Sequence, residues 1–108
     1  MKFIIALSLV FGATPVLART TQIADLQVGE TVTITGTVQR ITDSDEFRLK
    51  DETGSVLVYI GPNNVPFDLG EKVTVTGIVD REIGQLEVYA RSAQRADGSK
   101  LAFDHRYD

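Results

Sequence analysis

Several side chains that could hold a charged or planar ligand recur with a spacing of two. Such spacing places side chains on one face of a β-strand. A tyrosine beside a guanidinium or ammonium group can stack on a base or a sugar while the cation holds a phosphate or carboxylate. The same residue types also suit an ordinary exposed strand face, where they serve cross-strand pairing and solubility. The candidate ligand-binding residues are Arg40, Arg48, Lys50, Leu57, Tyr59, Tyr89 and Arg91.

Residues for catalysis are scarce. The chain has no cysteine, and its one histidine, His105, stands near the end between Asp104 and Arg106. A Ser-His-Asp triad needs a rigidly held histidine, whereas a histidine in a tail is expected to be solvated. We therefore predict no catalytic residue and no enzymatic activity, and nothing in the sequence implies a cofactor.

Two clusters of carboxylates are the remaining candidates for site chemistry. One consists of Asp43, Asp45 and Glu46, and the other of Asp51 and Glu52. Each cluster falls in an expected turn, where aspartate favours local hydrogen bonds to the backbone. Calcium sites need several oxygen ligands at defined spacings, and no such run is present. The clusters indicate turns, and no metal site is predicted.

A repeated segment indicates two of the strands that must position these residues. The segment 29–40 recurs as 70–81, and eight of the twelve paired residues are identical. Each copy alternates valine or isoleucine with threonine, which is typical of a strand buried on one side. Each copy also has a central glycine, Gly36 or Gly77, and a glycine inside a strand usually marks a bend or bulge. We therefore expect two bent strands that turn the corners of a small barrel.

The full pattern predicts strands at 31–41, 46–50, 55–60, 72–80 and 85–91. Pro62 and Pro66 exclude a strand in the connection at 61–68, because each removes a backbone donor. Five short strands of this kind predict an all-β protein, a five-stranded OB-fold Greek-key barrel. Because successive side chains of a strand point to opposite faces, the following residues are assigned to the core: Val32, Ile34, Val38, Phe47, Leu49, Val56, Val58, Ile60, Val73, Val75, Val79, Leu86, Val88 and Ala90.

The chain divides into three parts by composition. Residues 1–18 have Lys2, an apolar stretch too short to span a bilayer, and a small-residue site ending at Ala18, which predicts a signal peptide cleaved after Ala18. The barrel occupies 19–95. A polar tail follows at 96–108, in which Leu101 and Phe103 alternate as they would in an added strand. The expected location is the bacterial periplasm.

Strand motifs in this order resemble those of the bacterial periplasmic OB-fold (BOF) family of small exported stress-tolerance proteins. They are Val32-x-Ile34-x-Gly36-x-Val38, Phe47-x-Leu49-x-Asp51-x-x-Gly54-x-Val56-x-Val58, Gly70-x-x-Val73-x-Val75-x-Gly77-x-Val79-Asp80 and Leu86-x-Val88. The resemblance implies an OB barrel that binds a ligand without catalysis. It also implies a role in tolerance of envelope stress such as cationic antimicrobial peptides and oxidants.

Net charge separates the candidate partners. The chain carries a formal charge of −4, which suits a small or peptide-like cationic ligand better than nucleic acid. Binding of single-stranded nucleic acid would depend on Arg48 and Lys50, whereas a cationic ligand would depend on Asp43, Asp45, Asp51 and Glu52. An interaction module for another envelope protein is a third possibility. The sequence leaves the oligomeric state open.

Overall fold

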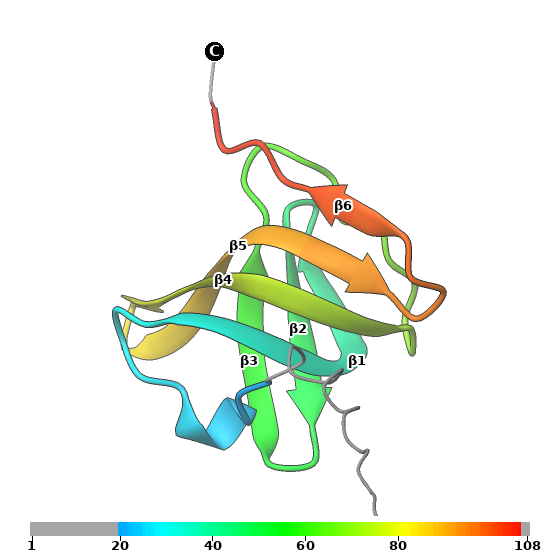
Figure 1. Ribbon diagram of the computed structural model, residues 1–108. Coiled ribbons are helices and arrows are strands. Elements are labelled where there is room, and N and C mark those ends of the chain that lie inside the picture. Colours follow the sequence, from blue (N-terminus) through cyan, green and yellow to red (C-terminus); the bar gives the residue numbers. More distant parts are fainter. Residues whose placement is uncertain (1–19, 107–108) are drawn as a thin grey trace, which may run out of the picture.

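One sheet of six strands makes up most of the protein in the computed structural model, which describes residues 20–106 (Figure 1). Its strand order is β3-β2-β1-β4-β5-β6, and an additional β3–β5 pairing closes the first five strands into a barrel. The closed five-stranded sheet is an OB-fold, as predicted. The elements are η2 (Ile23–Asp25), β1 (Thr31–Asp43), β2 (Glu46–Asp51), β3 (Gly54–Tyr59), β4 (Lys72–Glu82), β5 (Gln85–Arg95) and β6 (Lys100–Ala102).

Strand β1 takes part in both sides of the barrel. Its first half pairs antiparallel with β4, from Thr31 opposite Ile78 to Thr37 opposite Lys72. Its second half pairs antiparallel with β2. Closure comes from β3 and β5, which run parallel and place Leu57 beside Glu87 and Tyr59 beside Tyr89.

The two strand glycines lie where another strand passes very close. A Cβ atom on Gly36 would stand 2.5 Å from the backbone oxygen of Lys50, and one on Gly77 would overlap the backbone oxygen of Tyr89. The register between β4 and β5 also shifts between Thr76 and Gly77. Both positions therefore need glycine because no side chain fits between the strands.

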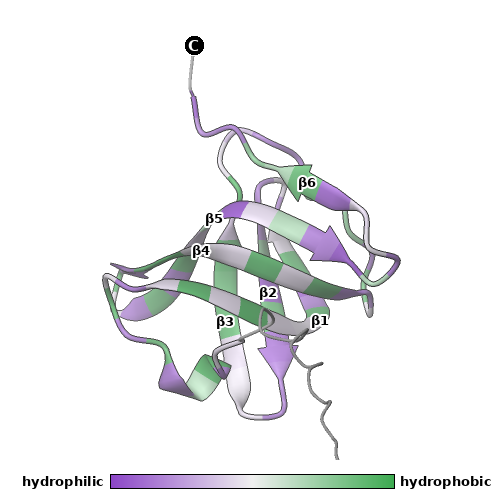
Figure 2. Cartoon of the chain, viewed as in Figure 1, coloured by the Kyte–Doolittle hydropathy of each residue, from purple (hydrophilic) through white to green (hydrophobic). Residues whose placement is uncertain are grey.

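The barrel interior contains the residues that the two-residue alternation along each strand assigned to it. Thirteen of the fourteen predicted core positions are buried, and Leu86 is partly buried against them. Apolar and polar residues alternate along the strands for this reason (Figure 2). Ile23 and Leu26 of the lead-in, Phe67 of the β3–β4 connection, and Ala93 and Phe103 add to the same core.

The two ends of the chain differ in what the structure describes. The expected signal peptide at 1–18 and its cleavage site lie outside the described residues. In the C-terminal tail, β6 pairs antiparallel with β5, and the Phe103 amide donates to the Arg91 carbonyl over 2.9 Å. Among the described residues, no helix has the length and apolar character needed to cross a membrane.

Candidate functional site

A hollow lined by carboxylates and two tyrosines lies on the outer face of the barrel where β3 meets β5. We call it the acidic hollow. It has a volume of about 360 Å³, and the lining contains no lysine, arginine or histidine from residues 20–106. Its lining residues are Asp43, Asp45, Glu46, Tyr59, Asp80, Glu82, Glu87 and Tyr89. This composition gives the hollow a negative potential beside two aromatic rings.

Local strand geometry explains how these residues converge. Asp43 and Glu46 face each other across the β1–β2 hairpin, and Glu46 lies opposite Tyr59 on β3. The parallel closure then brings β5 alongside, and Glu87 lies opposite Asp80 on β4. Residues from all five barrel strands thus share one surface because each occupies an outward position.

Tyr59 and Tyr89 form the aromatic wall of the acidic hollow. They are neighbours in the β3–β5 register, and their rings meet edge to face with centroids 5.2 Å apart. A tyrosine face attracts cations through its quadrupole. The sequence assigned both residues to the candidate ligand surface, and the structure brings them together.

His105 packs against this wall, so its expected place in a solvated tail is wrong. Its ring lies 4.3 Å from the Tyr89 ring, centroid to centroid, and its Nε2 lies 2.5 Å from the Ala90 carbonyl oxygen. A Cβ atom on Gly61 would stand 2.6 Å from its Nδ1. The tail docks there because Gly61, buried and with a φ of 75°, leaves room for the imidazole.

Glu87 is the most unusual member of the acidic hollow. Glu87 is only 7% exposed, although a glutamate with an ordinary pKa is charged at neutral pH and is rarely buried. The pKa of Glu87 is raised to about 7, first by burial and then by the interaction of its carboxyl group with Glu46 and by the negative charges of Glu46, Glu82 and Asp80. Strongly shifted carboxyl groups in hollows are typical of functional sites.

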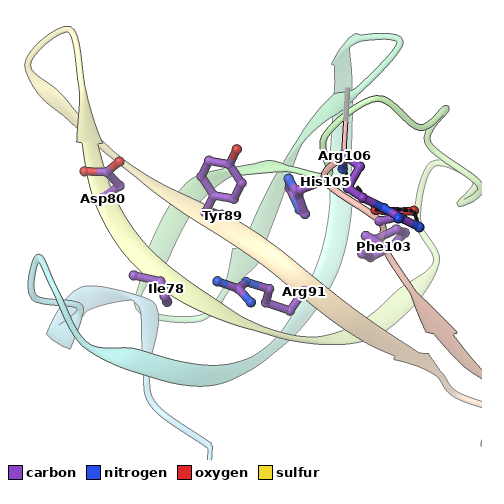
Figure 3. Close-up of a pocket in the computed structure, with 8 residues that line it drawn as sticks. Ile78, Asp80, Tyr89, Arg91, Phe103, His105 and Arg106 are labelled. Atoms are coloured by element: carbon purple, nitrogen blue, oxygen red, sulfur yellow. Dashed lines mark hydrogen bonds and ion pairs between the residues drawn. The ribbon is translucent and has the colours of Figure 1, made fainter. Parts of the chain in front are cut away.

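A second hollow, of about 560 Å³, adjoins the first and shares Asp80 and Tyr89 with it. Figure 3 shows Tyr89, Asp80 and Ile78 on one side, with His105 and Phe103 on the other. Arg91 reaches in from β5, and Arg106 pairs with Asp104 over 3.2 Å. This second hollow carries charges of both signs.

The other predicted site residues lie apart from the aromatic wall. Arg48 is on the outer face of β2, where its guanidinium donates to the Ser55 hydroxyl over 3.0 Å and to the Gln85 side chain over 3.4 Å. Arg40 is opposite it on β1, and Lys50 lies opposite Ser55. Leu57 also has an outward register but is only 8% exposed, so its expected place on an open face is wrong.

The two carboxylate clusters of the sequence have different roles. Asp43, Asp45 and Glu46 line the acidic hollow. Asp51 instead caps the β2–β3 turn, where it accepts hydrogen bonds from the amides of Ile23, Thr53 and Gly54. Glu52 lies in the same turn, outside the acidic hollow. The expectation that Asp51 and Glu52 serve a cationic ligand with the other carboxylates is therefore not supported by their positions.

None of the six carboxylates of the hollow was among the candidate ligand-binding residues, and Asp80, Glu82 and Glu87 were also absent from the two predicted carboxylate clusters. Asp80 and Glu82 alternate at the end of β4, and Glu87 and Gln85 face them across a hairpin. That cross-strand pairing of acidic positions was readable from the sequence. Within residues 20–106, no group of three or more acidic, histidine or cysteine side chains is arranged to hold a metal ion.

Comparison with a solved structure supports the fold. No protein-family model matches the chain, and no curated protein matches it in sequence. The hypothetical protein ygiW from E. coli is similar in structure, with a TM-score of 0.62 and 21% sequence identity over 72% of this chain and 90% of that one. Telomere capping protein Ten1 from Saccharomyces pombe has a TM-score of 0.49 and 23% identity over 67% of this chain and 71% of that one.

Proposed function

We propose that this chain is a non-catalytic binding protein of the bacterial periplasm that holds a small or peptide-like organic cation in the acidic hollow. The observation that carries the proposal is the lining itself: six carboxyl side chains and two tyrosines, with no basic residue. Coulomb attraction favours an ammonium or guanidinium group there, and the faces of Tyr59 and Tyr89 add cation–π attraction.

The charge balance of the described residues leaves the acidic hollow free for an external cation. The ion pairs found within residues 20–106 are Arg95 with Glu71 and Arg106 with Asp104. None of these four residues lines the acidic hollow. The carboxylates of the hollow therefore repel one another in the free protein, and a bound cation would relieve that repulsion.

The strand motifs shared with BOF proteins support the same function and a link to envelope-stress tolerance. A phosphate backbone would be repelled by the acidic hollow, and Arg48 already bonds to Ser55 and Gln85. These features make single-stranded nucleic acid the weaker candidate. Docking on another envelope protein through this face would require a basic segment of that protein.

Nuclear magnetic resonance mapping tests the proposal. We suggest titrating the ¹⁵N-labelled chain from Arg19 to Asp108 with an N-acetylated, C-amidated tetra-arginine peptide, and separately with an eight-nucleotide single strand of thymidines. The peptide should shift the amides of 43–46, 80–82 and 87–89. Shifts confined to Arg40, Arg48 and Lys50 with the oligonucleotide, and none with the peptide, would contradict cation binding and favour nucleic acid.

A further inference from the structure

We propose that the acidic hollow takes up its cation in exchange for a proton that Glu87 holds against Glu46. This inference rests on the proposed function and specifies how the same site is regulated. It makes cation binding and proton release one linked event.

The geometry of the two glutamates supports the exchange. Glu87 is buried on β5, and its outward neighbours in register are Leu57 on β3 and Asp80 on β4. Its carboxyl group shares the acidic hollow with that of Glu46 on β2, and no basic side chain from residues 20–106 lines this hollow. A buried carboxyl group surrounded by other carboxylates favours its neutral form, because burial and like charges both oppose ionisation. The proton therefore belongs to the free protein.

The surroundings of Glu87 oppose its ionisation. The acidic groups that line the hollow with it come from β1, β2, β4 and the β1–β2 turn, and they are Asp43, Glu46, Asp80, Glu82 and Asp45. Arg48 is the cation on the neighbouring outward position of β2, but its guanidinium bonds to Ser55 and Gln85. Tyr59 and Tyr89 complete the wall, with His105 packed behind Tyr89. Burial among these groups raises the pKa of Glu87 to about 7.

A cation that enters the acidic hollow reverses this balance. A guanidinium or ammonium group near Glu46 and Glu87 favours the ionised form of both carboxyls. The proton leaves Glu87 for the solvent, and the cation takes its place as the positive charge between the two oxygens. The O–H bond of Glu87 is the only covalent bond that breaks, and the charges balance because one positive charge enters as one proton leaves.

The exchange has a numerical consequence. If Glu87 must ionise for binding and has a pKa of about 7, affinity should be about tenfold weaker at pH 6 than at pH 8. The same linkage predicts the release of about three quarters of a proton per cation bound at pH 6.5. The tetra-arginine peptide suits the test because guanidinium groups stay charged throughout this range.

Calorimetry in buffers of different ionisation enthalpy measures the released protons directly. The chain from Arg19 to Asp108 should release about three quarters of a proton when the peptide binds at pH 6.5. Glu87→Gln should bind without release and lose the pH dependence of affinity. Glu52→Gln, at the distant β2–β3 turn, should match the wild type in affinity and in proton release.

The outcomes separate this inference from the function on which it rests. Peptide binding with no proton release, and with equal affinity at pH 6 and pH 8, would overturn the exchange but leave cation binding intact. No binding of the peptide would overturn both. A ¹³C titration of the Glu87 carboxyl in the free protein gives a further check, because a pKa near the ordinary value of 4.5 would also overturn the exchange.

Discussion

The imidazole of His105 lies 4.3 Å from the ring of Tyr89, measured between centroids, and this contact ties the end of the chain to the aromatic wall of the acidic hollow. The same segment is held by Asn63, whose side-chain amide donates to the carbonyls of Ile60 and Asp104. The tail therefore supports the β3–β4 connection and the candidate site together. It extends the barrel beyond β5 with contacts that reach the binding face.

Gly61→Ala should undock this tail. Gly61 has a φ of 75°, and a methyl group there would stand 2.6 Å from His105 Nδ1. We expect a loss of about 1–3 kcal/mol in the free energy of unfolding, from the backbone conformation and the displaced ring together. Hydrogen exchange at the Phe103 amide, which bonds to the Arg91 carbonyl, should become faster.

Gly70→Ala is the matched control for that substitution. Gly70 has a φ of 84° but no atom within 4 Å of the added carbon. Gly70→Ala should therefore lower the free energy of unfolding only by the cost of placing alanine in a left-handed backbone conformation. Hydrogen exchange at the Phe103 amide should stay unchanged. Equal effects of the two alanines on that amide would contradict the role of the Gly61–His105 contact.

Gly77→Ala should destabilise the barrel where β4 and β5 cross. Its Cβ atom would overlap the Tyr89 carbonyl oxygen and stand 2.8 Å from the Ala90 Cα. Both obstacles are backbone, so the strands must separate, at a cost of about 2 kcal/mol or more. Denaturant melts provide the measurement. Gly54→Ala, where the added carbon would stand 3.7 Å from Ile23 Cγ2, should change stability by less than about 1 kcal/mol; similar losses in both variants would count against a steric cause.

Glu87→Gln should stabilise the protein above neutral pH. Because the folded-state pKa of Glu87 is raised to about 7 from an ordinary 4.5, the folded protein binds more protons than the unfolded chain between these values. The contribution of Glu87 to wild-type stability must therefore fall as pH rises from 4.5 to 7. After allowance for solvent screening, the variant should exceed the wild type by about 1–3 kcal/mol at pH 8.

Thermal and denaturant melts at several pH values check this linkage. The two proteins should approach equal stability near pH 4, where Glu87 is protonated in both the folded and the unfolded wild type. A difference in the free energy of unfolding that stays constant between pH 4 and pH 8, or a less stable variant at pH 8, would contradict this prediction. Either result would show that ionising Glu87 in the folded protein does not cost the expected free energy.

Asp51→Asn should destabilise the β2–β3 turn by about 1–2 kcal/mol at pH 7. Burial acts to raise the pKa of Asp51, but its hydrogen bonds with Thr53, Ile23 and Gly54 outweigh that effect and lower it. A lowered pKa means that the carboxylate contributes stability above the unfolded value of 3.8, and that this contribution is lost as pH falls through the folded value. The gap between variant and wild type should therefore narrow below about pH 4 in denaturant melts. A difference in the free energy of unfolding that stays constant with pH would argue against hydrogen bonds to an ionised Asp51.

Local pattern explains why the barrel itself was predictable. Alternation along each strand identified the core, since a buried face repeats every two residues. The glycines at 36 and 77 stood out for the same reason, as interruptions in β-branched strands. Each of these signals lies within a few neighbouring residues.

The candidate site was only partly predictable because its contacts are distant in sequence. Tyr59 and Tyr89 meet through the parallel closure of β3 on β5, which no short motif encodes. His105 reaches Tyr89 through space left by Gly61, far away in the chain. The acidic cluster at 51–52 resembles that at 43–46 in composition, and only the hydrogen bonds of Asp51 show that it serves the turn.

Binding calorimetry on charge-neutral variants tests cation binding in the acidic hollow most directly. The measurement is the affinity of the tetra-arginine peptide for the wild-type chain from Arg19 to Asp108, for a double variant carrying Asp80→Asn and Glu82→Gln, and for Asp51→Asn. The double variant should bind at least about tenfold more weakly, since it removes two of the lining charges. Asp51→Asn should bind as the wild type does, because Asp51 lies outside the acidic hollow. Undiminished affinity in the double variant, or a comparable loss in Asp51→Asn, would contradict the proposed site.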